Sequence, residues 1–134
     1  MIVADTNLVA YLLLEGENTA TAEQVLEKDS HWIAPFLWRS EFRNVLAIYV
    51  RQDLLSLEEA LEIQEVGEVL LGGREYSLVS EDVLRTAQRS GCAAYDCEFV
   101  VLAEKNEIPL VTSDRRVLDA FPEVAVHPRA FVGR

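Results

Sequence analysis

The sequence predicts one α/β domain built around a parallel sheet. Short apolar runs alternate with helical patterns along the whole chain, and the first run, Met1–Asp5, has the unbroken apolar character of a strand buried on both faces. The 134 residues match the length of about one domain, and half of them are hydrophobic. No linker, repeat or low-complexity stretch divides the chain, so we expect a single domain over residues 1–134.

The elements of the first half follow from apolar runs and capping residues. Thr6 or Asn7 can cap a helix, because such side chains accept hydrogen bonds from free backbone N–H groups. Thr21 followed by Gln24 resembles a capping box. In order, the predicted elements are a strand over Met1–Asp5, a helix from Thr6 or Asn7 through Leu14, a helix over Ala22–Lys28, a strand over His31–Ala34 stopped by Pro35, and a helix from Phe36 to about Gln52.

The second half continues the alternation. Ser56 with Glu59 forms another capping box, and Gly72-Gly73 ends the helix that it opens. Ser80 is expected to cap the next helix, which ends near Gly91. The predicted elements are helices over Ser56–Leu71, Ser80–Gly91, Ala94–Asn106 and Arg115–Ala120, and strands over Tyr76–Val79, Ile108–Thr112 and Val124–His127.

Two carboxylates lie on apolar helix faces. Glu41 follows Leu37 by four residues on one such face, and Asp96 lies one turn before the apolar stripe of its own helix. The apolar residues that define these faces are Leu37, Val45 and Ile48 for Glu41, and Phe99, Val100 and Ala103 for Asp96. A salt bridge could explain Glu41, and the helix dipole could explain Asp96.

Two further carboxylates follow strands. Asp5 ends the first strand and Asp114 follows the fourth, although each could simply cap the helix after it. Ligands of open parallel sheets bind outside the carboxyl ends of the strands, where the strand order reverses. Asp5 and Asp114 would be neighbours if their strands flank that point, with Glu41 and Asp96 directed to the same place.

Four converging carboxylates call for a divalent cation. They cannot all stay ionised in one pocket without a counter-charge, and no lysine is placed to supply it. Oxygen ligands select Mg²⁺ or Mn²⁺. Such ions, singly or in pairs about 4 Å apart, support phosphodiester hydrolysis. The pattern therefore predicts metal-dependent cleavage of a nucleic-acid backbone.

These residues resemble a known family. The chain is similar to the PIN-domain nucleases, and most of all to the VapC-type toxins of bacterial and archaeal toxin–antitoxin pairs. The matching blocks arrive in family order and spacing over nearly the whole chain. They are Ile2-Val3-Ala4-Asp5-Thr6-Asn7, Pro35 through Ser40-Glu41 into Val45-Leu46, Ala94-Tyr95-Asp96-Cys97 leading to Leu102-Ala103-Glu104, and Pro109-Leu110-Val111-Thr112-Ser113-Asp114.

The resemblance implies a fold, an activity and partners. It implies a five-stranded parallel sheet of order 3-2-1-4-5 flanked by helices, with Mg²⁺- or Mn²⁺-dependent cleavage of single-stranded RNA at its carboxyl edge. It also implies a cognate antitoxin and a homodimer. Carried over by position, the metal-binding and catalytic acids are Asp5, Glu41, Asp96 and Asp114, and the polar residues that orient them are Thr6, Asn7 and Thr112.

The net charge of the chain indicates which classes of partner it can bind. A net charge of −11 disfavours broad coating of DNA but suits a basic protein partner, such as an antitoxin that directs an Arg or Lys at the acids.

Arg115 and Arg116 directly follow Asp114 and are the best candidates to bind substrate phosphates. Arg39, Arg43, Arg85 and Arg89 are weaker candidates. Trp32, Trp38, Tyr11 and Tyr95 are assigned to core packing rather than to stacking on bases.

The remaining features concern assembly and location. The apolar positions Leu57, Leu61, Val66, Val69 and Leu70 exceed what one short helix needs for packing, so we expect them to form a homodimer or antitoxin contact. No membrane segment or secretion signal is visible, and Cys92 and Cys97 are expected to stay reduced, which indicates a cytoplasmic protein.

Three alternatives stay open. A housekeeping RNA-processing PIN nuclease would share the same chemistry, although the compact length favours a toxin. A catalytically inactive PIN fold used for binding conflicts with the intact set of acids. A receiver-type signalling module also has acids at the carboxyl edge of a sheet, but it needs a lysine where this chain has His127-Pro128.

Overall fold

A computed structural model describes residues 1–134, in which five short strands form one parallel sheet of order β3-β2-β1-β4-β5. This confirms the strand order that the family resemblance implies. Val3 of the central strand pairs with Ile33 on one side and with Leu110 on the other, so β1 is fully enclosed. The strands are β1 (Ile2–Ala4), β2 (Trp32–Pro35), β3 (Glu75–Tyr76), β4 (Leu110–Val111) and β5 (Ala125–Val126).

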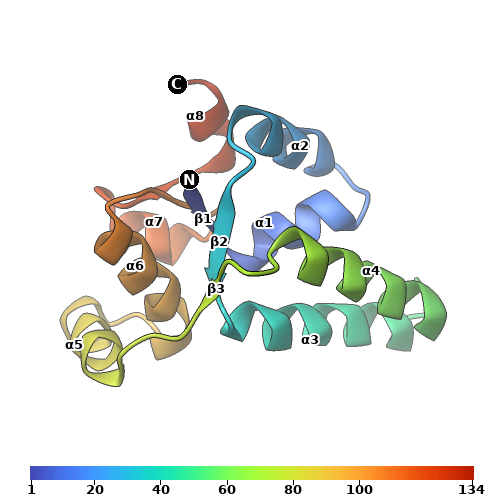
Figure 1. The fold of residues 1–134 in the computed structure, drawn as a ribbon, viewed down its shortest axis with the longest axis horizontal. Helices are drawn as coiled ribbons and strands as arrows, with labels where there is room; N and C mark the ends of the chain where they lie inside the picture. The colour runs from blue at the N-terminus through green and yellow to red at the C-terminus, as the bar shows by residue number, and fades with distance from the viewer.

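Helices cover both faces of this sheet (Figure 1). One side carries α5, α6 and α7, and the other carries α1 to α4, with α3 and α4 extending together away from the sheet. The C-terminal α8 packs against α2. The helices are α1 (Thr6–Leu13), α2 (Thr19–Lys28), α3 (Leu37–Arg51), α4 (Leu57–Leu70), α5 (Ser80–Ser90), α6 (Ala94–Asn106), α7 (Arg115–Ala120) and α8 (Pro128–Val132).

Several local predictions are confirmed. The Ser56 hydroxyl accepts from the Glu59 N–H while the Glu59 carboxylate accepts from the Ser56 N–H, which is the capping box that opens α4. Gly91 ends α5 at a φ of 74°, a left-handed conformation that costs glycine little. The bounds of α6 and α7 agree with the predicted helices. Such features depend on residues only a few positions apart.

Other caps were predicted wrongly. Thr6 and Asn7 do not cap α1. Asp5, the other cap that the sequence offers, does so, because the chain leaves β1 at Asp5 in an extended conformation that lets its carboxylate accept from the Leu8 N–H. Thr21 lies inside α2, which begins at Thr19 and has no side-chain cap. Ser80 is the first residue of α5 and also makes no capping bond.

The sequence prediction missed α8. His127 caps this helix, since its Nδ1 accepts from the Arg129 N–H at 3.1 Å, and Pro128 occupies the first helical turn. Lys28 fastens α8 to the end of α2 by donating to the carbonyl of Phe131 at 2.5 Å and lying 4.8 Å from the centre of its ring. Proline after a potential cap was the available signal.

The core confirms most assignments of aromatic residues. Trp32 and Trp38 are fully buried, whereas Tyr95 is 66% exposed, so its assignment to the core was wrong. Tyr95 lies in the first turn of α6, where the side chain before Asp96 faces solvent. Cys92 and Cys97 are buried free thiols, as expected. No helix is long and apolar enough to span a membrane.

Candidate active site

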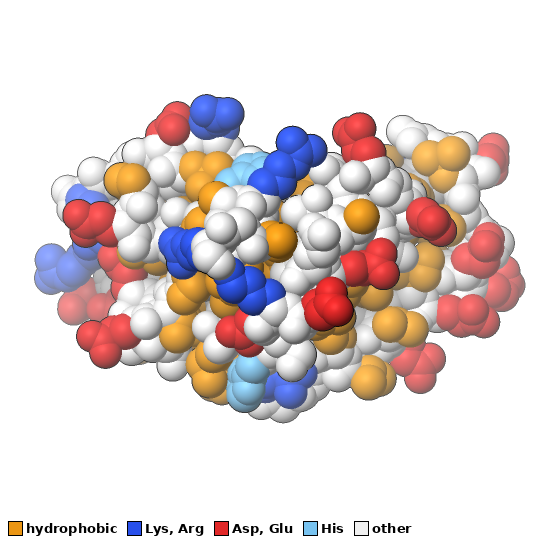
Figure 2. All heavy atoms as spheres, turned by 90° about the horizontal axis from the view of Figure 1, so that it is seen from above, with side chains coloured by type: hydrophobic (Ala, Val, Ile, Leu, Met, Phe, Trp, Pro, Cys, Tyr) orange, Lys and Arg blue, Asp and Glu red, His pale blue; other side chains and the backbone are white.

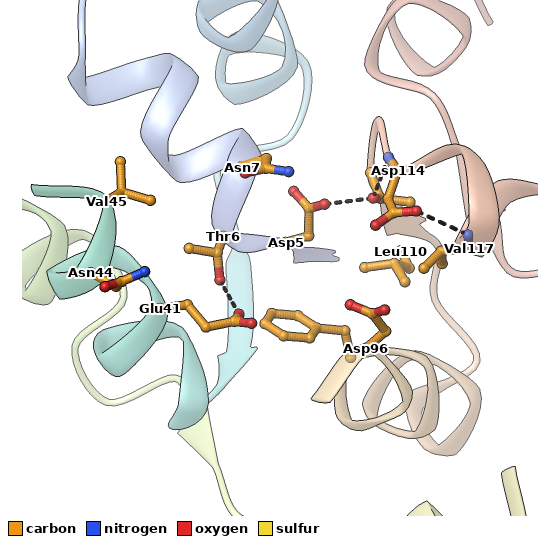
Figure 3. Close-up of a pocket in the computed structure, with 12 residues that line it drawn as sticks. Asp5, Thr6, Asn7, Glu41, Asn44, Val45, Asp96, Leu110, Asp114 and Val117 are labelled. Carbon is orange, nitrogen blue, oxygen red and sulfur yellow. Dashed lines mark hydrogen bonds between the residues drawn. The ribbon is translucent and has the colours of Figure 1, made fainter. Parts of the chain in front are cut away.

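The four predicted acids line one open cavity of about 270 Å³ at the carboxyl edge of the sheet (Figure 3). Each comes from a different element. Asp5 ends β1, Glu41 lies on α3, Asp96 lies on α6, and Asp114 follows β4. The complete lining is Asp5, Thr6, Asn7, Glu41, Asn44, Val45, Asp96, Phe99, Leu110, Thr112, Asp114 and Val117. We call this cavity the acid pocket.

Asp5 is held by hydrogen bonds to both of its oxygens. Oδ1 accepts from the Leu8 N–H at 2.8 Å, and Oδ2 accepts from the Thr112 hydroxyl at 2.5 Å. Burial raises the pKa of Asp5 to about 6, and the charges of Asp114 and Glu41 add to this rise while the two hydrogen bonds oppose it. Asp5 is therefore both a helix cap and an acid that is costly to ionise.

Glu41 lies beside the buried face of α3 rather than within it. The buried residues of this helix are Trp38, Phe42 and Leu46, whereas Leu37 and Val45 are only half-buried. The predicted apolar face was thus rotated from the true one, because the helix packs through its larger aromatic side chains. Glu41 faces the acid pocket, where its Oε1 accepts from the Thr6 hydroxyl at 2.7 Å. No salt bridge holds Glu41.

Burial also raises the pKa of Glu41, and the charges of Asp96 and Glu98 raise it further. The pKa of Asp96 is raised by burial and by the charge of Asp114, and the nearby Arg116 opposes this rise. Three carboxylates of one pocket therefore share a shift toward the protonated form. A cation among them would reverse that shift, because it favours ionised carboxylates.

Asp96 and Asp114 are placed by neighbouring helices. Asp96 lies in the first turn of α6, one turn before the buried Phe99 and Val100, as predicted. Asp114 caps α7, since its Oδ1 accepts from the N–H groups of Arg116 at 2.9 Å and Val117 at 3.3 Å. In Figure 3 the carboxylates of Asp5, Glu41, Asp96 and Asp114 point from separate sides toward the same space.

The predicted polar neighbours also lie here. The Thr112 hydroxyl donates to Asp5 and accepts from the Asp114 N–H at 3.0 Å, so it joins two of the acids. Thr6 holds Glu41, and Asn7 lines the pocket with an exposed amide. The sequence prediction missed Asn44, one turn after Glu41, which the i, i+3 spacing could have indicated.

The sequence prediction also missed a hydrogen bond to the loop that carries Asp114. The hydroxyl groups of Tyr11 and Ser113 are 2.9 Å apart and form a hydrogen bond between α1 and the residue before Asp114. The two residues are 102 positions apart in sequence, so no local pattern could have indicated the pair.

Some of the candidate arginines form ion pairs within the protein, whereas others form none. Arg39 pairs with Glu75 at 2.6 Å and with Glu68 at 2.9 Å, so it holds β3 and α4 rather than facing the acid pocket. Arg115 and Arg116 are exposed at the rim, and Arg116 is near enough to Asp96 to influence its pKa. Arg85 and Arg89 form surface ion pairs with Glu81 and Glu104.

The donor set fits a hard divalent cation in kind. All charged groups of the acid pocket are carboxylates, joined by the amides of Asn7 and Asn44, and each Asp5 oxygen keeps a lone pair beyond its one hydrogen bond. No three acidic, histidine or cysteine side chains lie close enough together to hold an ion in the present arrangement. Binding would therefore require the carboxylates to draw inward.

Solved structures share this fold over nearly the full chain. The structure of PAE2754 from Pyrobaculum aerophilum matches with a TM-score of 0.79 at 19% identity, over 99% of this chain and 94% of that one. The structure of FitAcB from Neisseria gonorrhoeae matches with a TM-score of 0.71 at 19% identity, over 96% of this chain and 99% of that one.

Sequence comparison identifies the family. Ribonuclease VapC3 from Pyrobaculum aerophilum is 30% identical over 124 residues, which cover 90% of this chain and 95% of that protein. The model of the PIN domain matches residues 2–125. This match leaves the receiver-type interpretation without support. Because the PIN domain model matches most of its length, the chain belongs to the PIN domain family.

Proposed function

We propose that the protein is an endoribonuclease that uses Mg²⁺ or Mn²⁺ to cut single-stranded RNA, and that it acts as the toxin of a toxin–antitoxin pair. The observation that carries the proposal is the acid pocket, where Asp5, Glu41, Asp96 and Asp114 converge at the carboxyl edge of the sheet. Membership of the PIN domain family and 30% identity to a protein named Ribonuclease VapC3 support the reaction class.

Asp5, Glu41, Asp96 and Asp114 would hold the metal. When bound, the ion would act as a Lewis acid, making a water molecule more acidic and neutralising negative charge on the scissile phosphate. Thr112 and Thr6 hold the carboxylates of Asp5 and Glu41 through single hydrogen bonds, which fixes the direction of the remaining lone pairs. An uncharged amide at Asn7 can contact the substrate without adding to the negative charge of the pocket.

Arg115 and Arg116 would bind substrate phosphates at the rim. Both guanidinium groups are exposed and make no ion pair, so they are free to bind an RNA backbone that the acids alone would repel. Arg116 is the stronger candidate because its charge already acts on Asp96. Its role would be to orient the strand across the acid pocket.

An antitoxin with basic and apolar residues fits the surface. Acidic side chains gather over the end of the molecule where α4 lies, and no Lys or Arg is visible there (Figure 2). Leu61 and Val69 of α4 are 61% and 76% exposed, which supports burial against a partner, either the antitoxin or a second copy in a homodimer. Leu70 packs partly against the core, so it contributes less to this surface than its apolar character predicts.

The test is cleavage of a labelled single-stranded RNA by the purified full chain. We expect cleavage with Mg²⁺ or Mn²⁺ and none in excess EDTA. Asp5→Asn and Asp96→Asn should abolish cleavage, and Asp114→Asn should leave the most residual activity. Asp119→Asn is the matched control, because Asp119 is exposed on α7 and makes no ion pair. Undiminished activity in EDTA would contradict the proposal.

The toxin role has a separate test. Expression of the wild type should arrest growth of a bacterial host, whereas Asp5→Asn should not. Co-expression of the product of the adjacent upstream gene should restore growth if that gene encodes the antitoxin. Cleavage in vitro without growth arrest would instead favour a housekeeping RNA-processing nuclease.

A further inference from the structure

A second polar cavity lies next to the acid pocket and contains no carboxylate. It has a volume of about 240 Å³ and lies between the first turn of α2, the end of β5 and the loop before Asp114. Its lining residues are Tyr11, Asn18, Thr21, Ala22, Ser113, His127, Pro128 and Arg129. In a chain with 23 acidic and 12 basic residues, a polar cavity without an acid differs sharply from its surroundings. We call it the basic cavity.

The polar groups of the basic cavity have unused donors. Arg129 is exposed and forms no ion pair, although most of the charged residues of the chain are acidic. His127 uses Nδ1 to accept from the Arg129 backbone, which leaves the Nε2 proton of the neutral ring free to donate. The side chains of Asn18 and Thr21 are half-buried and make no hydrogen bond within the protein. These side chains can all donate hydrogen bonds that no group of the protein accepts, and such a set of donors suits an anion.

A third cavity adjoins both the basic cavity and the acid pocket. It has a volume of about 300 Å³, and it shares Asn7 and Val45 with the acid pocket and Tyr11 and Asn18 with the basic cavity. Ser113 lines the basic cavity, whereas Asp114, the next residue, lines the acid pocket. On the face shown in Figure 2, basic side chains lie over the region of α2 and α8 and are absent from the acidic end.

We infer that the basic cavity binds a backbone phosphate of the RNA strand, on the far side of the Ser113–Asp114 loop from the reacting phosphate. Arg129 supplies the charge, and His127, Asn18 and Thr21 supply hydrogen-bond donors to the phosphate oxygens. A strand that crosses the acid pocket would reach the basic cavity by way of the third cavity, which shares Tyr11 and Asn18 with it. The inference rests on the proposed recognition of single-stranded RNA and adds a site that positions the strand away from the reacting bond.

The test measures RNA binding rather than cleavage. Arg129→Glu is compared with Arg51→Glu, the same charge change at another exposed, unpaired arginine at the far end of α3. Both are made in the Asp5→Asn chain, and binding of a labelled single-stranded RNA long enough to span both cavities is followed by fluorescence anisotropy. We expect Arg129→Glu to weaken binding about tenfold. It should also reduce the slope of log affinity against log salt by about 0.7, as for the loss of one phosphate contact.

A dinucleotide is the second arm, because its single backbone phosphate cannot occupy the acid pocket and the basic cavity at the same time. Its affinity should be the same for the two variants. NMR of the His127 ring adds a local readout, and its resonances should shift with the long RNA and not with the dinucleotide. If inorganic phosphate shifts these resonances while Arg129→Glu leaves RNA affinity unchanged, the cavity binds free anions and the inference is wrong.

The remaining outcomes separate this inference from the proposed function. Equal effects of Arg129→Glu and Arg51→Glu on an RNA that the wild type cleaves would overturn the inference alone. Selective loss of RNA binding in Arg129→Glu by a protein that never cleaves RNA would support the inference and overturn the proposed activity. If Arg129→Glu weakens binding of the antitoxin and not of RNA, the cavity binds a peptide carboxylate, which also overturns the inference.

Discussion

The hydroxyl of Thr112 lies 2.5 Å from Oδ2 of Asp5, and it joins two acids that the chain places 109 residues apart. The hydroxyl oxygen of Thr112 also accepts a hydrogen bond from the Asp114 N–H at 3.0 Å. Thr112 is 1% exposed, so neither bond competes with bulk water. One threonine thus fixes Asp5 relative to Asp114, although it is not itself a charged group.

Replacement of Thr112 tests this coupling. Thr112→Val keeps the shape of the side chain but removes both hydrogen bonds, and we expect a loss of RNA cleavage of about 10- to 100-fold, typical of residues that orient metal ligands. The free energy of unfolding should fall by about 2 to 4 kcal/mol, because two hydrogen bonds are lost and one of them is to a carboxylate. Thr112→Ser keeps the hydroxyl and is the control. Equal activity of the two variants would show that the hydroxyl has no role.

The pH dependence of stability tests the burial of Asp5. Its pKa is raised to about 6 from 3.8, so in the metal-free protein the folded state binds more protons than the unfolded state between these values. Stability should therefore fall as pH rises from about 4 to about 6, by at most about 3 kcal/mol from this group. Asp5→Asn should remove this part of the profile and raise the metal-free free energy of unfolding at pH 7 by about 2 kcal/mol.

Denaturant melts in EDTA at several pH values provide the measurement. Glu75, whose pKa Arg39 holds low, contributes a slope of the opposite sign in both proteins, so the difference between wild type and Asp5→Asn isolates Asp5. With Mg²⁺ or Mn²⁺ in excess, the order should reverse, because only the wild type would gain stability from the ion. If stability changed with pH in the same way in the wild type and in Asp5→Asn, the raised pKa assigned to Asp5 would be wrong.

The Tyr11–Ser113 hydrogen bond gives a prediction about the loop that carries Asp114. Tyr11→Phe removes one hydroxyl that contacts Ser113 at 2.9 Å. We expect kcat to fall about tenfold and the affinity for Mn²⁺, measured by calorimetry, to weaken, since Asp114 follows Ser113 directly. Tyr49→Phe is the matched control, because Tyr49 is half-buried and lines the third cavity together with Tyr11 but makes no contact with Ser113 through its hydroxyl. An unchanged Mn²⁺ affinity in Tyr11→Phe would rule out a positioning role.

The exposed apolar residues of α4 give a prediction about assembly. Light scattering at high micromolar concentration should give the mass of a dimer, and Leu61→Glu or Val69→Glu should convert it to a monomer. Leu84→Glu on α5 is the control, because Leu84 is 63% exposed, close to the 61% of Leu61. A monomeric wild type, or equal disruption by all three changes, would contradict a dimer built on α4.

The negative acid pocket gives a prediction about inhibition. An inhibitory partner should insert an Arg or Lys among Asp5, Glu41, Asp96 and Asp114, because a guanidinium can pair with two carboxylates and compete with metal for the same oxygens. Inhibition should weaken as Mg²⁺ is raised, and also when that basic residue becomes Ala. Inhibition that is insensitive to both changes would place the partner elsewhere on the protein.

The candidate site was predictable because its acids stand in unusual local patterns. Asp96 before an apolar stripe and Asp114 after a buried strand can both be found without structural information, and the structure brings both to one pocket. Glu41 was selected through an apolar face that proved to be misplaced, since Trp38 and Phe42 rather than Val45 turn α3 toward the core. Glu41 reaches the acid pocket because of how the whole of α3 packs against the core.

Features that depend on neighbours along the chain could be predicted without the structure. These include the Ser56–Glu59 capping box, the turn at Gly91 and the alternation of apolar runs with helices, because a hydrogen bond or a stripe over a few residues is independent of distant packing. The contacts of Thr112 with Asp5 and of Tyr11 with Ser113 follow instead from how distant segments pack together. Contacts between residues about 100 positions apart depend on how β1 and β4 pair and on where α1 then lies, which no local pattern specifies.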